Sequence, residues 1–419
     1  MKEFLKTALL ILLGLSAAFL VYRTWVYDNS LFGREMQGPA VFAPERLDYA
    51  PASAVPAGCA VMLDGIRTGA RYDTETRDVY NAFKILLADA FGSVTSAEPL
   101  TGGRAWQSVL QSDGVYFEFT GSLPISLLTA WLSADGSRLP VLGIPLDSAV
   151  ESIGLAFGDG AVRLFWSCPD GEFWLAETEA EFSGWPELPE LRPCAFAFES
   201  DYAAGWAPRQ LLIDETRPRP TAVISAPPDI RQSDSAYAPF LETLELFVGS
   251  TTHYDRSGGR VYVDIENGRT CEFFADGSVL FSNPAAARSA SLSNDSSVAA
   301  DVLRAWEALS RLELVMGGGR FEVSRVTQSP GGTAVEFFVM FGGVPVRWES
   351  AVVETAGGEL ERITLRLCVI EEGEGAGVPL PLRLAAALGP QNGAARLDLR
   401  YLPVSRADAE ADVFWVVSE

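Results

Sequence analysis

The spacing of apolar residues along the chain predicts short helices alternating with groups of antiparallel strands. Between residues 76 and 91, apolar side chains recur every three or four positions, as on one face of a helix: Val79, Tyr80, Phe83, Leu86, Leu87, Ala90 and Phe91. Shorter helices are expected at 104–111 and at 122–132, and strands at 114–120, 150–157, 161–167 and 172–177. These elements predict a first α+β unit that ends near the proline-broken stretch 184–193.

A second unit combines one helix with the clearest strand pattern in the sequence. The helix is expected at 237–248, and its apolar face carries Phe240, Leu241, Leu244 and Phe247. In 260–266 the residues alternate, so that one face carries Val261, Val263 and Ile265, and the solvent face carries Tyr262, Asp264 and Glu266. Asn267-Gly268 and Asp276-Gly277 have the composition of type I′ turns, which predicts a three-stranded meander through 270–275 and 278–282.

A third unit begins with a helix expected at 297–314, preceded by the Ser/Asn/Asp cluster 293–296, whose side chains are good helix caps. Strands are expected at 320–328, 333–341, 344–354, 359–370, 395–402 and 412–417, and a short helix at 380–388. The glycines Gly373, Gly375 and Gly377 stand among glutamates that would repel phosphate. They therefore predict a flexible acidic loop and not a phosphate-binding loop.

The predicted fold class is α+β, with an N-terminal transmembrane helix followed by two or three extracytoplasmic domains of helices packed on antiparallel β-meanders. A length of 419 residues is more than one core usually holds. The expected parts are a cytoplasmic N-terminus with the transmembrane helix (1–30), an N-terminal α+β ectodomain (31–193), a middle helix-plus-meander domain (194–288) and a C-terminal α+β domain (289–419).

The first residues have the pattern of a single membrane anchor. From Phe4 to Tyr22 only Lys6 is charged, and about 20 mostly apolar residues are enough to cross a bilayer as a helix. The basic residues before this run favour a cytoplasmic N-terminus, which would place the rest of the chain outside the membrane. A cleavable signal peptide, cut after Ser16-Ala17-Ala18, is the alternative. The apolar run continues beyond that point, which favours the uncleaved anchor.

The composition argues against some partners, and it does not decide whether any of the cysteines form a disulfide bond. The net charge is −23 and the only lysines are Lys2, Lys6 and Lys84, which argues against binding of nucleic acid. The five cysteines are far apart and odd in number, without the close spacing of a zinc or redox motif. Buried free thiols are expected, and a bridge between Cys168 and Cys194 is an alternative.

Residues with catalytic chemistry are scarce in the sequence. The only histidine is His253, and no Gly-x-Ser-x-Gly motif accompanies it. Acidic pairs such as Asp264 and Glu266 are expected by chance among 55 acidic residues. We therefore expect no enzyme, no cofactor and no metal site. An anchored hydrolase, which would need His253 or a carboxylate pair in a cleft, is the least favoured hypothesis.

The predicted anchor carries a face of small residues. Gly14 and Ala18 are four positions apart, which in a helix places them on one side and lets a second membrane helix approach closely. Ala and Gly are also common in membrane helices without any such role. With this face, a homodimer or a heterodimer would be expected to form through Gly14 and Ala18.

Three segments of the sequence resemble the YycH family of membrane-anchored regulatory proteins. They are the N-terminal Lys-x-x-Leu-Lys-Thr anchor, the run Gly-Val-Tyr-Phe-Glu-Phe-Thr-Gly-Ser-Leu-Pro-Ile-Ser-Leu-Leu at 114–128, and the meander at 260–283. Gly343-Val-Pro-Val and the strand after Gly357-Gly358 are similar to a C-terminal module shared with YycI proteins. The resemblance implies a complex with a YycI-like membrane protein and a sensor histidine kinase of the YycG (WalK) type, in which contacts between transmembrane helices adjust kinase activity.

Two functional hypotheses follow from the sequence. The first is a non-enzymatic, membrane-anchored regulator of a two-component sensor kinase, located at the cell membrane with its body outside. The alternative is a binding module for an envelope component such as a cell-wall fragment. That alternative predicts a pocket lined by exposed aromatic residues such as Trp131, Trp166 and Trp174.

Overall fold

The computed structural model describes residues 56–133, 148–158, 160–199, 210–213, 218–247, 251–256, 258–286, 297–329, 331–387, 396–403 and 410–418. All of these ranges fall within one unit, Tyr49–Glu419. The predicted anchor with Gly14 and Ala18, and the predicted cap cluster 293–296, lie outside the described residues. Within the described ranges, no helix is both long enough and apolar enough to cross a membrane.

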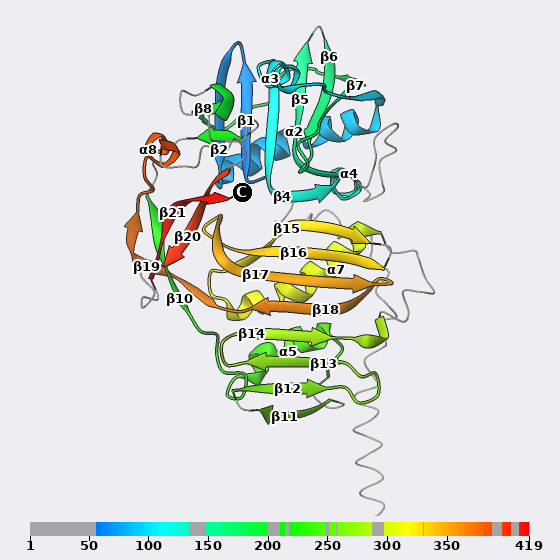
Figure 1. Cartoon of the computed structure of the whole chain (residues 1–419), viewed down its shortest axis with the longest axis vertical. Coiled ribbons are helices and arrows are strands. Elements are labelled where there is room, and N and C mark those ends of the chain that lie inside the picture. The colour runs from blue at the N-terminus through cyan, green and yellow to red at the C-terminus, as the bar shows by residue number, and fades with distance from the viewer. Residues whose placement is uncertain are drawn as a thin grey trace, which may run out of the picture. The chain divides into compact units, whose positions relative to one another are not determined.

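The first part of the chain folds into a nine-stranded antiparallel sheet (Figure 1). Its strand order is β3-β7-β6-β5-β4-β1-β2-β8-β9. The strands are β1 (Gly58–Leu63), β2 (Ile66–Arg71), β3 (Val94–Pro99), β4 (Gly114–Pro124), β5 (Ala149–Gly158), β6 (Ala161–Ser167), β7 (Phe173–Glu181), β8 (Arg192–Phe196) and β9 (Leu211–Ile213). The strand β4 lies in the middle of the sheet and is buried on both faces over most of its length, which explains its nearly continuous apolar sequence.

Helices cover both faces of this sheet. The helices α2 (Thr74–Gly92) and α4 (Ile125–Leu132) pack on one face, where the predicted apolar stripe of α2 joins the main core. The helix α3 (Gly103–Leu110) places Trp106 on the other face, against Phe165 and Phe173. The three helices predicted in this part of the chain are therefore present. The third begins at Ile125 and not at Ser122 as predicted, because residues 122–124 still belong to β4.

The second part forms a twelve-stranded sheet. Its strands are β10 (Arg219–Ser225), β11 (Thr252–Arg256), β12 (Gly259–Val263), β13 (Thr270–Phe274), β14 (Ser278–Ser282), β15 (Arg320–Ser329), β16 (Gly332–Phe341), β17 (Val344–Ala356), β18 (Glu359–Arg366), β19 (Val369–Gly377), β20 (Arg396–Pro403) and β21 (Glu410–Ser418). The meander β11–β14 joins β18, and β18 joins β17. β16 also pairs with β17, and β15 pairs with β16. The start of β17 pairs in parallel with β20, which leads to β21, β10 and β19.

Two helices pack on the second sheet (Figure 1). The helix α7 (Val298–Ser310) contacts β15 to β18, and its first turn is capped by Ser297, whose Oγ accepts a hydrogen bond from the Ala300 backbone N–H at 3.2 Å. The helix α5 (Asp234–Thr243) packs Tyr237 and Phe240 edge-to-face against Phe273 of β13. The short helix α8 (Leu382–Ala387) follows β19. The predicted α+β class, with helices on mainly antiparallel sheets, is confirmed.

The two sheets meet where β4 and β15 are both irregular. The pairing of β4 shifts register between Glu118 and Leu123, and that of β15 shifts between Val323 and Arg325. At this point Gly121 lies so close to the other strand that an added Cβ would be 1.8 Å from the Ser324 carbonyl oxygen. Only glycine fits here, so the contact between the sheets depends on the missing side chain.

Two predictions for the middle unit are wrong in detail. The helix predicted at 237–248 ends at Thr243, because Glu245 adopts a left-handed conformation (φ 57°). The Leu246 N–H then donates to the Leu241 carbonyl at 2.9 Å, which closes the helix end and leaves Phe247 outside it, 54% exposed. In the meander, the core face carries Tyr262 and its partner Cys271, so Tyr262 is buried and not solvent-facing as predicted.

The predicted hairpins are present, but their turns are not of type I′. Such a turn needs a positive φ at both central residues, whereas only the glycines Gly268 and Gly277 have one in the two dipeptides. The strands β12 and β13 are instead joined by a six-residue loop in which the Asp264 N–H donates to the Arg269 carbonyl. The prediction also missed β11, a short strand that pairs with β12.

The predicted acidic loop around Gly373, Gly375 and Gly377 is wrong, because these residues form the strand β19. The glycines permit close packing: a Cβ on Gly373 would lie 2.3 Å from Thr221 Oγ1, and one on Gly377 would lie 1.5 Å from Asp412 Oδ1. Neighbouring strands therefore approach β19 where any larger residue would collide with them.

The strands of the predicted middle domain are shared between the two sheets. The strands β8 and β9 pair within the first sheet, while β11 to β14 continue the second sheet through the β14–β18 pair. The domain boundaries near residues 193 and 288 stay predictions.

Candidate functional site

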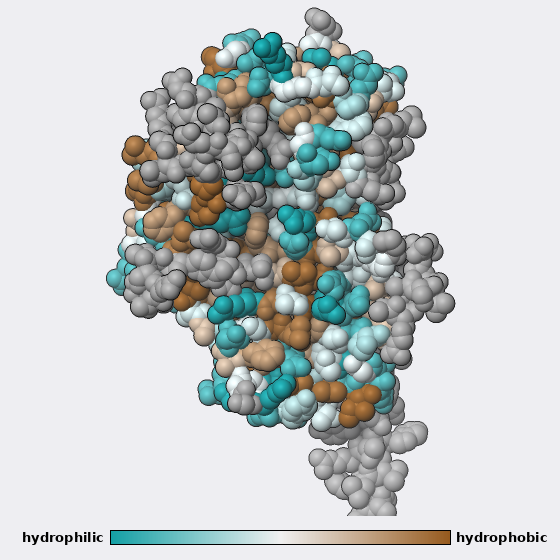
Figure 2. Space-filling model, in the orientation of Figure 1, coloured by the Kyte–Doolittle hydropathy of each residue, from teal (hydrophilic) through white to brown (hydrophobic). Residues whose placement is uncertain are grey.

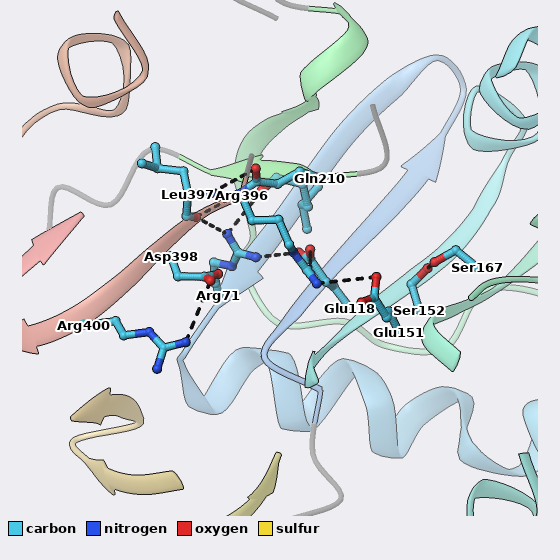
Figure 3. A network of polar contacts seen from close by, with 11 residues as sticks. Arg71, Glu118, Glu151, Ser152, Ser167, Gln210, Arg396, Leu397, Asp398 and Arg400 are labelled. Atoms are coloured by element: carbon cyan, nitrogen blue, oxygen red, sulfur yellow. Dashed lines mark hydrogen bonds and ion pairs between the residues drawn. The ribbon is translucent and has the colours of Figure 1, made fainter. Parts of the chain in front are cut away.

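A buried carboxylate and two arginines form an ion-pair triad at the junction of the two sheets (Figure 3). Glu118 of β4 is 1% exposed, and its two carboxylate oxygens accept from Arg71 at 2.5 Å and from Arg396 at 2.7 Å. Arg71 comes from β2 of the first sheet and Arg396 from β20 of the second. One carboxylate thus joins segments that are 278 residues apart in sequence.

Further hydrogen bonds extend this triad along β20. The Gln210 side chain donates to the Leu397 carbonyl at 2.7 Å and accepts from the Leu397 N–H at 3.1 Å, as a neighbouring strand would. On the other side, Arg396 lies 3.5 Å from Glu151 of β5 (Figure 3). Hydrogen bonds and ion pairs, which require a defined geometry, therefore hold the start of β20 against the first sheet.

Charge pairing outweighs burial in the triad. Burial alone would lower the pKa of a guanidinium, yet the pKa values of Arg71 and Arg396 are raised because Glu118 lies next to both. The two guanidinium groups therefore stay charged at every pH where the protein folds. Such a triad fixes the position of the strands but has no spare group for proton transfer.

A cavity of about 490 Å³ lies at the same junction and is lined by both sheets. Its walls come from the start of α2, from β4, β10 and β15, and from the turn between β16 and β17: Tyr72, Asp73, Thr74, Glu75, Arg77, Thr120, Arg219, Gly318, Arg320, Glu322, Met340, Gly342 and Gly343, with Pro56 and Ala57. Its volume is in the range of cavities that bind small molecules. Its lining is mostly polar and charged.

One wall of the cavity is a fixed ion-pair cluster around Asp73. The two Asp73 oxygens accept from Arg192 at 2.6 Å and from Arg219 at 3.0 Å, so this carboxylate does not cap α2. Arg219 also donates to the Gly342 carbonyl at 3.1 Å, which ties the β16–β17 turn to the wall. Tyr72 adopts a left-handed backbone conformation here (φ 54°), which is unusual for a large residue and indicates a constrained segment.

Three other charged residues that line the cavity are not paired. Within the described ranges, the side chains of Arg77, Arg320 and Glu322 make no hydrogen bond and do not come within 4.0 Å of an opposite charge. Arg77 and Arg320 are exposed and Glu322 is half-buried. Burial raises the pKa of Glu322 to about 7, although the two arginines oppose this shift, and Glu313 of the short helix η5 (Leu312–Val315) adds to it. The unpaired groups are therefore two cations facing a carboxyl that titrates near neutral pH.

The structure does not bring the sequence-predicted chemical residues together in this site. Gly14 and Ala18 lie outside the described residues. His253 is exposed on β11, where its ring centroid lies 5.8 Å from that of Tyr262. Cys194 is a free thiol, so the alternative of a Cys168–Cys194 bridge is wrong. No group of three His, Cys, Asp or Glu residues suited to a metal ion occurs in the described part of the chain.

The predicted pocket lined by tryptophans is also wrong. Trp131 and Trp166 are 6% and 1% exposed and belong to the core, and Trp174 stacks on Trp166 with ring centroids 5.8 Å apart. The cavity is lined by charged residues that sequence reasoning did not select. Glu118 did carry a signal, because it is the one charge in an otherwise apolar strand and such a charge requires buried partners.

An exposed apolar patch lies apart from the cavity. Figure 2 shows hydrophobic residues gathered over α8 and the strands beside it. The exposed ones from the segment between β19 and the end of α8, and from the face of β21 that carries Trp415, are Val378, Leu380, Leu384 and Val417. The Trp415 indole donates to the Leu380 carbonyl at 2.7 Å, which fixes part of the patch. Apolar surface of this kind is typical of contacts with other proteins.

No protein-family model matches the chain, and no curated protein matches it. Among solved structures, an uncharacterized protein from Eubacterium rectale is similar over 48% of this chain and 77% of its own, with 10% identity and a TM-score of 0.33. The dehydratase domain from the CurK module of curacin polyketide synthase aligns over 68% of this chain and 99% of its own, with 8% identity and a TM-score of 0.12. Likenesses this distant say nothing about the function of the chain.

Proposed function

We propose that the chain is a non-enzymatic, membrane-anchored regulator of a two-component sensor histidine kinase. The observation that carries the proposal is the apolar run from Phe4 to Tyr22, with Gly14 and Ala18 on one face and a large acidic body behind it. The resemblance to the YycH family supports the same partners, a kinase and a YycI-like membrane protein. The body would lie outside the membrane and the first residues in the cytoplasm.

The junction between the two sheets supports this proposal physically. A regulator without catalytic chemistry acts by favouring one arrangement of a partner, and it needs a body that presents a defined surface. The Arg71–Glu118–Arg396 triad holds strands of both sheets in one register. The ectodomain would thus act on the anchor and its partners as a single body.

Recovery of the kinase from detergent extracts tests the proposal. The tagged full-length protein is isolated from its native membrane, and co-isolated proteins are identified by mass spectrometry. The double variant Gly14→Leu/Ala18→Leu is expected to recover at least tenfold less kinase, because leucine side chains keep a neighbouring helix at a distance. Ser16→Leu is the matched control, since at 3.6 residues per turn Ser16 would lie on the opposite side of a helix.

Two results would count against the proposal. If the wild-type protein recovers no sensor kinase, the regulator function is wrong. If the double variant recovers as much kinase as wild type and Ser16→Leu do, the part assigned to Gly14 and Ala18 is wrong.

A second candidate function is binding of an envelope component, and the cavity at the junction favours it. The cavity combines a suitable volume with unpaired charged groups, Arg77, Arg320 and Glu322. A ligand bound there would contact both sheets. Ligand binding could therefore also control the activity of a regulator. A digest of the cell wall that raises the melting temperature of the purified protein would support this function, and a digest without effect would oppose it.

A further inference from the structure

We propose that the junction cavity binds a small zwitterion, an amino acid or short peptide, with its carboxylate at Arg77 and Arg320 and its ammonium group at Glu322. This inference rests on the second candidate function and names its class of ligand. It begins from a difference between the charged residues that line the cavity. Asp73 is engaged by both Arg192 and Arg219 and has no free oxygen to offer a ligand as an ion pair.

Arg77, Arg320 and Glu322 also line the cavity, and these charges of both signs form no ion pair with one another. Arg320 and Glu322 are two positions apart on β15 and therefore share one face of the strand, and Arg77 of α2 lines the same cavity. Both arginines act on the charge of Glu322. In the described part of the chain none of them forms an ion pair within 4.0 Å. A charged group placed between them would therefore gain contacts that the protein itself does not make.

The combination of signs selects the class of ligand. An anion bound to Arg77 and Arg320 would be repelled by an ionised Glu322, and a cation at Glu322 would be repelled by the two arginines. A molecule that carries a carboxylate and an ammonium group satisfies both. The cavity of about 490 Å³ has room for more than a single ion, and the hydroxyls of Thr74 and Thr120 on its wall suit the amide groups of a peptide.

The titration of Glu322 gives this site a pH signature. The charged groups that act on it come from α2 (Arg77), from its own strand β15 (Arg320) and from η5 (Glu313). The ammonium group of a ligand needs an ionised Glu322, whose pKa is about 7. Between pH 8 and pH 6 the ionised fraction falls about tenfold, so affinity for a zwitterion should fall by about the same factor.

Three dipeptide probes separate the contributions of the two charges. Calorimetric titration of the full-length protein in detergent uses alanyl-alanine (in L,L and D,D forms), its N-acetyl derivative, which lacks the ammonium group, and its amide, which lacks the carboxylate. Alanyl-alanine is expected to bind at least tenfold more tightly than either derivative at pH 8. Arg320→Gln is expected to weaken its binding at least tenfold, and Glu322→Gln to remove the preference over the N-acetyl form.

The matched control is Arg325→Gln, on the same strand but paired with Glu336 and outside the cavity. It should bind alanyl-alanine as wild type does, and the melting temperature of each variant shows whether it is folded. Equal binding of alanyl-alanine and its N-acetyl form would overturn the role of Glu322. If a cell-wall digest stabilises the protein but no dipeptide binds, the ligand class is wrong and the second candidate function stands. If neither binds, both are wrong.

Discussion

Replacement of Glu118 by alanine should weaken the junction of the two sheets more than any exposed change of the same kind. The carboxylate is 1% exposed and is shared by Arg71, whose side chain is 5% exposed, and Arg396, whose side chain is 18% exposed. In Glu118→Ala these two guanidinium groups keep their burial but lose their common counter-ion. Water cannot replace the lost carboxylate fully at such a site.

The expected loss can be estimated from known cases. Removal of one partner from a buried ion pair costs about 3–5 kcal/mol, so we expect Glu118→Ala to lose about 4 kcal/mol of unfolding free energy. A cooperative unit of roughly 370 residues, such as Tyr49–Glu419, has an unfolding entropy of about 0.8 kcal/mol/K. The melting temperature should therefore fall by about 5 °C.

The assay is thermal unfolding followed by circular dichroism and differential scanning calorimetry. The matched control is Glu336→Ala, because Glu336 faces Arg325 at 3.7 Å on the surface, with 43% and 58% of the two side chains exposed. An exposed pair of this kind contributes about 0.5 kcal/mol, which corresponds to less than about 1 °C. If Glu118→Ala melts within about 1 °C of wild type and of the control, the assigned role of the triad is refuted.

Three other changes test other parts of the structure. Gly121→Val should lower the free energy of unfolding by about 3 kcal/mol or more, because its Cβ would collide with the Ser324 carbonyl. The control is Gly103→Ala, which should be nearly neutral because nothing lies within 4 Å of the added Cβ. Equal melting temperatures of the two variants would contradict the close approach of the strands at Gly121. Glu322 has a folded-state pKa of about 7 against an ordinary value of 4.5, so the folded state holds its proton more tightly and the contribution of Glu322 to stability is lost as pH rises from 4.5 to 7. Glu322→Gln should therefore stabilise the protein at pH 8, by at most about 3 kcal/mol, and not at pH 4. If the denaturation midpoint of the variant at pH 8 is no higher than that of wild type, the raised pKa of Glu322 is contradicted. Burial raises the pKa of Cys59 to about 12, so iodoacetamide should not label it at pH 8 until the protein unfolds, and rapid labelling of the folded protein would contradict this.

Local periodicity was enough to predict most elements. The residues expected on the apolar face of α2 are those that the structure buries or half-buries there, and the helix expected from Ser297 is present, with Ser297 as its cap and Val298 as its first residue. The strands β13 and β14 also lie where they are predicted, whereas β12 ends at Val263, three residues before its predicted end. In each case a pattern within about 15 residues determines the element.

Other features depend on contacts that a local pattern does not contain. The end of α5 is determined by a left-handed Glu245, a conformation that its residue type does not indicate. Tyr262 is buried because α5 and Phe273 cover that face of β12, and alternation alone does not say which face is covered. The parallel pair between β17 and β20 joins segments that are far apart in sequence, so no local pattern predicts it.

The candidate site was the least predictable part. Its cavity is assembled from the segment at Tyr72, from Arg219 and from the turn at Gly343, which are far apart in sequence. Arg77, Arg320 and Glu322 resemble ordinary surface charges until the fold shows that they face one another without pairing. Only Glu118 could have been selected from the sequence, as a lone carboxylate in an apolar strand.

Regulation of a sensor kinase is tested most directly by kinase activity in reconstituted vesicles. The kinase recovered with the full-length protein is reconstituted alone, with wild type, and with the Gly14→Leu/Ala18→Leu variant, and transfer of phosphate from ATP is measured. We predict that wild type changes the rate of autophosphorylation at least twofold and that the variant leaves the rate of the kinase alone unchanged. An identical rate in all three preparations, with wild type inserted in the same vesicles, would contradict the proposed function.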